Sequence, residues 1–482
     1  MEQRILVPGQ SCWRIEQARR LCVIVDAADY FRAVKQAMLQ AQRSLMLVGW
    51  DFDTRVGFES GTPTLEGPNR LGDFLSWLVQ QRPQLHIYVL KWDLGMLQSL
   101  GRGMRPMVLA SWFGSRRLHF KLDGSHPVGS AHHQKIVVID DTMAFCGGID
   151  ITAERWDTRE HADDDPRRRV PDYGLFGPWH DATTAVDGPV ARAIGEVARR
   201  RWEMATGHAP EPVDVDTDAW PECLEPTMRE VPVGIARTLP EMDECREVRE
   251  IEALYLAGIA AARRTIYLES QYLAARRLAE ALAERLAEPG GPEVIIVLPE
   301  EIDSWLEHEA MDGARARLLH MLWRADRHGR LGTYYPVTAG GESIYVHAKI
   351  MVIDDVLLRV GSSNLNNRSM GYDTECDLAV EADEGNEDLR KVIHSVRDDL
   401  VREHLDVTAA ELEAQLQAQS GSLLAAIGKL RSDDGRSLRA FDPERIAEDD
   451  SPLAESDLLD PEGLARPRHR VRTLLARLRH KR

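Results

Sequence analysis

Short apolar runs alternate along the chain with helix-like segments, and the same alternation occurs twice. The segments AQRSLMLVGWDFD, near Ser44, and ARRTIYLESQYL, near Thr265, each run from the end of a helical pattern into an apolar strand. The segments LHIYVLKWD, from Leu85, and EVIIVLPEEID, from Glu293, form a second pair of apolar strands. Alternating strands and helices are typical of α/β proteins. The pattern therefore predicts an α/β fold built from two similar copies, related by a pseudo-twofold axis.

The strongest sign of duplication is a motif of the form HxKxxxxD, followed by apolar residues and a glycine turn. It reads HHQKIVVIDDTMAFCGGID in the first copy and VHAKIMVIDDVLLRVGSSN in the second. The aligned residues are His133 with His347, Lys135 with Lys349, and Asp140 with Asp354. Further along, a carboxylate precedes an apolar strand in both copies, and these aligned carboxylates are Asp181 and Glu375.

The repeats divide the chain into four parts. We expect the first copy at residues 1–206 and the second at residues 246–405. The segment 207–245 is acidic and rich in proline, which predicts a linker or surface loop. Residues 406–482 are expected to form a partly helical C-terminal extension. The charged insert 159–172 of the first copy is interpreted as a solvated loop.

The spacing of the motif places chemistry on one face of a strand. Residues two positions apart share a face, so His133 lies beside Lys135 and His347 beside Lys349. If the two copies face one another, one site holds two imidazoles and two ammonium groups. The ammonium groups suit the charge of a phosphodiester and of its pentacoordinate transition state. One imidazole can attack phosphorus, and the other can protonate the leaving alcohol.

Each imidazole is expected to need a hydrogen-bond partner that fixes its tautomer. The alignment assigns Asp181 to His133 and Glu375 to His347. Asn364 is a candidate to bind phosphate together with the two motif lysines, and its counterpart in the first copy is an aspartate that cannot donate when ionised. The two half-sites are therefore expected to differ, as a nucleophile and an acid should.

Further polar residues of the motifs are candidates for structural roles or for phosphate binding. Asp140 and Asp354 belong to the candidate catalytic set through their motif, but they fall at the strand end on the opposite face, which favours a structural role. Arg155 and Arg368 are open between binding phosphate and bracing loops. The six cysteines show no metal-ligand spacing, so the sequence predicts no metal and no other cofactor.

Composition narrows the class of protein. The 482 residues are enough for two or three domains, and 43% hydrophobic and 29% charged residues are ordinary for a globular chain. A net charge of −18 argues against a nucleic-acid groove. The N-terminus shows no signal-peptide core and no apolar run approaches the ~18 residues of a membrane span, so we expect a cytoplasmic protein.

The last seventeen residues differ from the rest of this acidic chain. RPRHRVRTLLARLRHKR, residues 466–482, is strongly basic, with one apolar stripe at helical spacing. Such a helix suits an anionic membrane surface, and docking on the protein's own acidic surface is the equal alternative. A peripheral place at the membrane is therefore left open.

These motifs resemble the phospholipase D superfamily, whose mark is a pair of HxKxxxxD motifs. The likeness is closer to the eukaryotic-type enzymes, through GGIDITAERWDT after the first motif and GSSNLNNRSMGYDTE after the second. It covers roughly residues 20–405 and implies two α/β/α sandwich domains with a shared active site. It also implies a covalent phosphohistidine intermediate, with His133 as the nucleophile and His347 as the acid.

The resemblance implies hydrolysis of a phosphatidylcholine-like lipid to phosphatidate, with transphosphatidylation to alcohols. The expected partners are a phospholipid substrate, a membrane surface and water or an alcohol as acceptor, without nucleic acid. Because one chain holds both half-sites, we expect an active monomer. A cardiolipin or phospholipid synthase is the alternative at the same site. A nuclease fits the acidic balance poorly, and a non-catalytic lipid-binding protein fits the two intact motifs poorly.

Overall fold

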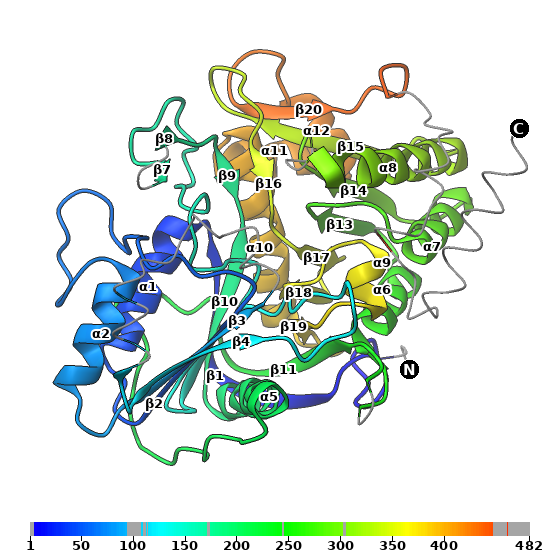
Figure 1. Ribbon diagram of the computed structural model, residues 1–482. Coiled ribbons are helices and arrows are strands. Elements are labelled where there is room, and N and C mark those ends of the chain that lie inside the picture. Colours follow the sequence, from blue (N-terminus) through cyan, green and yellow to red (C-terminus); the bar gives the residue numbers. More distant parts are fainter. Residues whose placement is uncertain are drawn as a thin grey trace, which may run out of the picture.

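The computed structural model describes residues 4–93, 108, 112, 114–170, 174–242, 245–301, 305–446 and 460, with the side chains of 305–312 outside this description. Within these residues, sixteen strands form one mixed sheet that runs through the whole molecule (Figure 1). Most elements of the first half, in blue, cyan and teal, lie on the left of the view, and most elements of the second half lie on the right. The basic tail 466–482 lies outside the described residues.

The two halves present their strands in the same spatial order. From the centre outward, the first half supplies β1 (Arg14–Val25), β10 (Ala182–Asp187), β6 (Met143–Gly147), β5 (Ile136–Ile139), β2 (Ser44–Gly49), β3 (His86–Trp92) and β4 (Leu118–Asp123). The second half supplies β11 (Met228–Leu239), β19 (Glu375–Glu381), β18 (Leu357–Gly361), β17 (Ile350–Ile353), β13 (Thr265–Glu269), β14 (Glu293–Val297) and β15 (Leu331–Val337). The predicted α/β fold is confirmed, and its two copies share one continuous sheet.

The centre of the sheet corrects the predicted linker at residues 207–245. Strand β11 lies within that segment and pairs antiparallel with β1 on one side and with β19 on the other. Its sequence, MREVPVGIARTL, alternates buried and exposed residues before it becomes continuously buried, which is the pattern of a strand entering a core. The linker is therefore confined to the residues before β11, and β12 (Val248–Arg249) extends the pairing after it.

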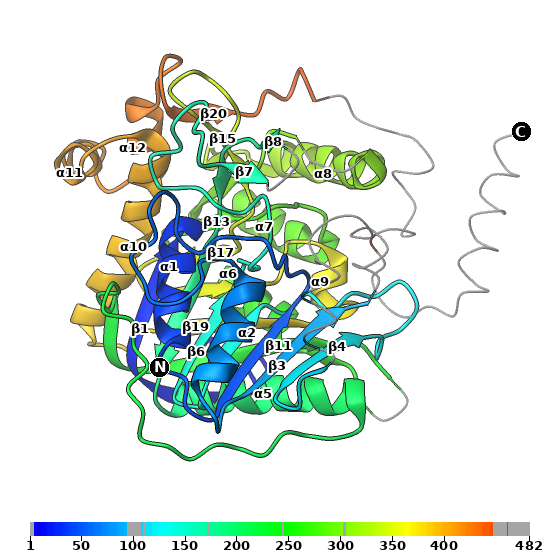
Figure 2. The ribbon, with the colours of Figure 1, turned by 60° about the vertical axis from the view of Figure 1, so that its left-hand side comes forward.

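Helices cover both faces of the sheet (Figure 2). One face carries α5 (Pro189–Thr206), α10 (Glu387–Leu405), α11 (Ala409–Ala418) and α12 (Leu423–Leu430), whose apolar residues share one core across both halves. The other face carries α1 (Ala27–Met38) and α2 (Leu71–Gln81) over the first half, and α6 (Glu250–Ala261), α7 (Arg276–Ala287) and α8 (Trp305–Ala325) over the second. The short helix α9 (Asn367–Gly371) follows β18.

The motif strands β5 and β17 contribute to both cores. Ile136 and Val138 of β5 belong to the shared core, whereas Val137 and Ile139 belong to the core beneath α1 and α2. Strand β17 divides its residues between the two faces in the same way. A strand buried on both faces is held rigidly, so the residues directly before it are fixed in place.

The C-terminal extension is partly helical, as predicted, through α11 and α12. It also adds a strand, because β20 (Ser437–Ala440) pairs antiparallel with β15 at the edge of the sheet. The charged insert 159–172 corrects another prediction, since His161 is 1% exposed and Arg168 is 2% exposed. His161 is held by Asp157 and by Glu403 of α10, and Arg168 by Asp157, whereas other charges of the insert, such as Asp163 and Asp164, are exposed as predicted. Within and after the insert, β7 (Arg169–Val170) and β8 (Gly174–Leu175) form a two-stranded ribbon.

Candidate active site

A small two-stranded sheet places each half of the molecule against the motif of the other. Strand β9 (Trp179–His180) of the first half pairs in parallel with β16 (Tyr345–Val346) of the second. The backbone N–H of His347 then donates to the carbonyl of His180 at 2.7 Å. The matching contact runs the other way, from the N–H of His133 to the carbonyl of Thr374 at 3.0 Å. Each motif histidine is therefore held by the opposite half.

The imidazole partners are crossed between the halves as well. Nδ1 of His133 lies 3.0 Å from Oε1 of Glu375. Nδ1 of His347 lies 2.6 Å from Oδ2 of Asp181. The predicted pairing of Asp181 with His133 and of Glu375 with His347 is therefore wrong. The prediction aligned each histidine with the carboxylate of its own repeat, whereas the halves meet so that each carboxylate reaches across.

Hydrogen bonds hold both carboxylates in place. Glu375 accepts from the hydroxyls of Ser362 and Ser369, and Asp181 accepts from the backbone N–H of Ala182 at 2.8 Å. Burial raises the pKa of Glu375 to about 8 and also raises the pKa of the Asp181 carboxyl. A positive charge on the adjacent imidazole lowers the pKa of its carboxyl partner, so each carboxyl is ionised when its ring is protonated. Neither serine was among the residues predicted from the sequence, although the Gly-Ser turn after the second motif was a signal for one of them.

The two imidazoles are neutral near pH 7. Burial, with the charges of Lys135 and Lys349, holds the pKa of His133 well below its usual range. Burial, with the charges of Lys349 and Arg155, does the same to the pKa of His347. With Nδ1 occupied by a carboxylate, Nε2 is the nitrogen that each ring can offer to a substrate. The lysine of either motif influences the histidine of the other, so the two motifs share one electrostatic site.

The two motif lysines are not equivalent. Nζ of Lys135 donates to the carbonyl of His133 at 3.0 Å and pairs with Oδ2 of Asp150, also at 3.0 Å. Nζ of Lys349 donates to the carbonyl of His347, and no carboxylate among the described residues forms an ion pair with it. Burial lowers the pKa of Lys349 to about 7. Lys349 therefore lacks a carboxylate in direct contact, although the charges of Asp181 and Glu375 still act on it.

Asn364 occupies the position in the second motif that Asp150 occupies in the first. It is buried, and its Oδ1 has no hydrogen-bond partner among the described residues. Replacing a carboxylate by an amide at this position leaves Lys349 without the partner that Lys135 has. Lys349 directly precedes β17 and Asn364 follows its partner strand β18, whereas Lys135 directly precedes β5 in the other half.

Arg155 reaches the site, whereas Arg368 braces a loop. The guanidinium of Arg155 lies 4.3 Å above the ring of Trp179, and that ring lies 5.3 Å from the ring of His347, centre to centre. Arg368 pairs with Asp373 at 2.8 Å. The two arginines that the sequence left open therefore have different roles.

The motif aspartates hold turns rather than imidazoles. Asp140 accepts hydrogen bonds of 2.7–2.8 Å from the backbone N–H groups of Gln42, Arg43 and Ser44. Asp354 accepts hydrogen bonds of 2.7–2.9 Å from those of Arg263, Arg264 and Thr265. Both residues have positive φ, 50° and 52°, which aspartate tolerates better than most residues. This geometry supports the structural interpretation of both.

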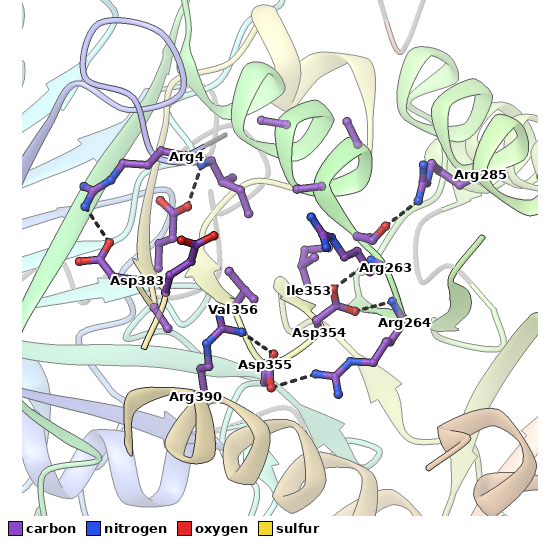
Figure 3. A pocket seen from close by; sticks show the side chains of 18 residues that line it. Arg4, Arg263, Arg264, Arg285, Ile353, Asp354, Asp355, Val356, Asp383 and Arg390 are labelled. Carbon is purple, nitrogen blue, oxygen red and sulfur yellow. Dashed lines mark hydrogen bonds and ion pairs between the residues drawn. The ribbon is translucent and has the colours of Figure 1, made fainter. Parts of the chain in front are cut away.

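A cavity of about 1460 Å³ opens at the far end of β17, where Asp354 lies (Figure 3). Its charges are paired within it, since Asp355 contacts Arg264 at 2.9 Å and Arg390 at 3.0 Å. His347 lies before the start of β17, so this cavity and the two motif histidines are at opposite ends of the strand.

The described helices include none that is long and apolar enough to cross a bilayer.

Comparisons with known proteins show a likeness to phospholipase D and cardiolipin synthase sequences. The family model described as "Cardiolipin synthase, PLD-like domain" matches residues 255–397. Phospholipase D A of Dictyostelium discoideum is 24% identical over 440 residues, which cover 74% of this chain and 32% of that protein. Phospholipase D1 of Schizosaccharomyces pombe is 23% identical over 497 residues, which cover 81% and 36%. Cardiolipin synthase A of Yersinia pseudotuberculosis is 27% identical over 263 residues, which cover 54% and 46%.

The chain therefore spans about a third to a half of the length of these curated relatives. Among solved structures, phosphatidylserine synthase of Haemophilus influenzae Rd KW20 superposes with a TM-score of 0.54 at 13% identity, covering 85% of this chain and 96% of that one. This likeness shows that the two proteins share a fold.

Proposed function

The chain belongs to the phospholipase D superfamily, and from that premise we propose that it is a phospholipase D-type phosphodiesterase. Its proposed substrate is a phosphatidylcholine-like phospholipid at a membrane surface. The products are phosphatidate and the free head group, or a phosphatidyl-alcohol when an alcohol replaces water. The observation that carries the proposal is the pair of crossed imidazole–carboxylate contacts. Because these contacts occupy Nδ1 of both motif histidines, Nε2 of each ring is available to react with one phosphodiester.

In the first step, Nε2 of His133 attacks phosphorus and forms an N–P bond. The bond between phosphorus and the head-group oxygen breaks, and that oxygen takes a proton from Nε2 of His347. His133 suits the attack because burial and the two lysines keep its imidazole neutral. Glu375 accepts a hydrogen bond from Nδ1–H of His133. It thereby stabilises the positive charge that grows on the ring as the N–P bond forms.

In the second step, His347 acts as the base. Its Nε2 takes a proton from water or from an alcohol, whose oxygen attacks phosphorus while the N–P bond to His133 breaks. The free His133 is restored, and His347 is again protonated for the next leaving group. Asp181 at 2.6 Å supports the imidazolium form of His347 in this cycle. The phosphodiester anion adds to this support, because an opposite charge nearby favours the protonated ring.

The lysines and Asn364 bind the phosphate. Burial lowers the pKa of Lys349 to about 7 in the free site, and an entering phosphodiester anion restores its charge. The ammonium groups then face the equatorial oxygens, where charge increases in the transition state. No step requires more than the side chains of this chain and the acceptor.

The second candidate is a phosphatidyltransferase of the cardiolipin synthase type. The matching family model carries that description, and the first step would be the same. The two activities differ only in the acceptor of the second step, which is water for the hydrolase and a lipid hydroxyl for the transferase.

The experiment that tests the proposal is a product assay on the full chain. Phosphatidylcholine, phosphatidylglycerol and single-stranded DNA are each incubated with the enzyme, with and without a primary alcohol. We expect phosphatidate without alcohol and a phosphatidyl-alcohol with it, both formed on the order of 10²–10⁴-fold more slowly in His133→Ala and His347→Ala. The matched control is His394→Ala, a half-exposed histidine on α10. Cardiolipin from phosphatidylglycerol alone would favour the transferase, and DNA cleavage without lipid turnover would refute the proposal.

A further inference from the structure

Away from the two motif histidines, four buried side chains direct one donor atom each to a common point. Asp26 ends β1 and precedes α1, His161 lies in the charged insert, His180 lies on β9 and Glu403 lies on α10. The four donor atoms all lie within 4.8 Å of one another. The side chains of all four are at most 2% exposed. The cluster therefore joins both halves of the molecule in its interior.

The donor atoms have the spacing of a tetrahedral metal site. Nε2 of His161 lies 3.5 Å from Oδ2 of Asp26 and 3.3 Å from Oε1 of Glu403. Nδ1 of His180 lies 3.3 Å from Oδ1 of Asp26 and 3.0 Å from Oε1 of Glu403. Zinc bonds of about 2.0–2.1 Å in a tetrahedron place neighbouring ligand atoms about 3.3–3.5 Å apart. If Asp26 binds the ion through Oδ2, three of these separations join ligand atoms, those of His161 from Asp26 and Glu403 and that of His180 from Glu403, and they fall in or close to this range.

The outer nitrogen of each imidazole is already fixed by a second carboxylate. Nδ1 of His161 donates to Asp157 at 2.9 Å, and Nε2 of His180 donates to Glu269 at 2.8 Å. With the proton on that side, the inner nitrogen of each ring carries a lone pair. A carboxylate behind a histidine is the usual arrangement around a zinc-binding imidazole, where it sets the tautomer and raises ligand basicity.

The alternative is that both rings are doubly protonated and form ion pairs with the two inner carboxylates. Burial alone would lower the pKa of His161, but the charges and hydrogen bonds of Asp26, Asp157 and Glu403 outweigh burial and raise this pKa to about 9. The net charge of the cluster does not distinguish the metal site from the ion-pair network, because two bound protons carry the same charge as one divalent ion. Hydrogen-bond geometry does, because Nδ1 of His180 and Oδ2 of Asp26 are buried and lack a hydrogen-bond partner among the described residues. Nε2 of His161 does form a hydrogen bond with Oε1 of Glu403, but at 3.3 Å it is longer than the charge-assisted hydrogen bonds of about 2.7–2.9 Å.

We propose that Asp26, His161, His180 and Glu403 bind one zinc ion that fastens the two halves of the molecule together. Two imidazoles and two carboxylates form a closed set of four ligands, as in a structural rather than a catalytic zinc site. The other oxygen of Glu403 is held by Arg159, and the other oxygen of Asp26 accepts from the N–H of Asp181 at 3.1 Å. The ligands are thus oriented before the ion binds.

The ion would act on the candidate active site through its position. The carbonyl of His180 accepts a hydrogen bond from the backbone N–H of His347. The carboxylate of the next residue, Asp181, accepts one from Nδ1 of the His347 ring. Fixing His180 therefore fixes the imidazole that is proposed to be the acid. His161, His180, Asp26 and Glu403 are positioning residues in this account, and zinc binding is measured without substrate, so it is independent of the proposed reaction.

The test is the zinc content of the full chain. The protein is treated with a chelator, dialysed against Zn²⁺, passed through gel filtration and analysed for metal by mass spectrometry. We expect about one zinc per chain in the wild type and in the control His394→Gln, and less than a tenth of that in His161→Gln. Zinc should also raise the Tm of the wild type and leave the Tm of His161→Gln unchanged.

A second measurement keeps the test valid if His161→Gln fails to fold. X-ray absorption at the zinc edge of the loaded wild type should show four nitrogen or oxygen ligands, two of them imidazoles. Wild-type protein that retains no zinc after gel filtration would overturn the proposal and leave the cluster as a protonated ion-pair network. Equal zinc in His161→Gln and wild type, or sulfur ligands in the absorption spectrum, would overturn it too.

Discussion

Nδ1 of His133 lies 3.0 Å from Oε1 of Glu375, a residue 242 positions further along the chain. The contact connects the motif of the first repeat to the strand that follows the motif of the second. The reciprocal contact, from His347 to Asp181, spans 166 positions. Neither half can therefore orient its own imidazole, and the candidate site is complete only when the two halves are joined through the sheet.

The first prediction concerns this crossing. Glu375→Gln and Asp181→Asn should each lower kcat on the order of 10²-fold or more, because each removes the charge that supports an imidazolium ring. A double-mutant cycle assigns the partners. We expect Glu375→Gln to have little further effect in His133→Ala and to keep its effect in His347→Ala.

The cycle for Asp181→Asn should give the reverse result, with its effect lost in His347→Ala. Circular dichroism of each variant serves as the control for folding. If instead Asp181→Asn has no effect on kcat in His133→Ala, each carboxylate supports the histidine of its own repeat. The crossed contacts are then not those of the working enzyme.

The second prediction concerns pH. Burial and the two lysines lower the pKa of His133, so its neutral, nucleophilic form persists below pH 6.5, the ordinary histidine value. The nucleophilic form of His133 is fully populated above the lowered pKa and is lost only as the pH falls through it. The acid limb of kcat/KM, measured on a soluble short-chain phosphatidylcholine, should therefore lie below pH 6.5.

Lys135→Met offers a further check on the cause of this shift, because Lys135 is the charged residue with the largest effect on the pKa of His133. Its absolute rate should fall, and its acid limb should move to higher pH. An acid limb at or above pH 6.5 in the wild type would contradict the account of the His133 environment.

The third prediction separates the motif aspartates from the chemistry. Asp354→Asn removes the charge that accepts three backbone N–H groups, and should lower the free energy of unfolding by about 2–4 kcal/mol. The neighbouring Asp355→Asn loses partly exposed ion pairs and should cost about 1 kcal/mol or less. Urea unfolding measures both, and kcat per folded enzyme should be near the wild-type value in each. A large loss of kcat in folded Asp354→Asn would return this residue to the catalytic set.

The fourth prediction concerns Arg155. Its guanidinium lies over Trp179 beside His347, so Arg155→Gln should raise KM for the phospholipid by about tenfold or more through loss of a charged phosphate contact. Arg390→Gln, in the cavity at the other end of β17, is the matched control and should leave KM unchanged. Equal KM values in the two variants would show that Arg155 only packs against Trp179.

The duplicated motif was enough to predict the α/β class and the residues that gather between the halves. It was not enough to predict the crossing of the carboxylates, since alignment relates equivalent positions and contains no information about which half faces which. Strand β11 was missed because its segment was judged by the acidic, proline-rich residues before it. Its alternating pattern, MREVPVGIARTL, was available to correct the judgement.

The buried charges of the insert were also beyond the sequence analysis. A run such as REHADDDPRRR has the composition of a solvated loop, and only tertiary pairing shows that His161 and Arg168 are buried. The four residues of the proposed zinc site are scattered from Asp26 to Glu403, without the close spacing by which metal sites are recognised in a sequence. Their proximity is a consequence of the fold and not of local order.

The most direct test of the central claim is to trap the covalent intermediate on His133. His347→Ala removes the acid and the base but leaves the nucleophile, so the intermediate should form on a short-chain lipid with a good leaving group and hydrolyse slowly. Mass spectrometry of peptides from enzyme denatured at alkaline pH, where the N–P bond survives, should find the phosphatidyl group on His133 and none in His133→Ala. A phosphatidyl group on another residue, or product formation in His133→Ala at the wild-type rate, would contradict the account.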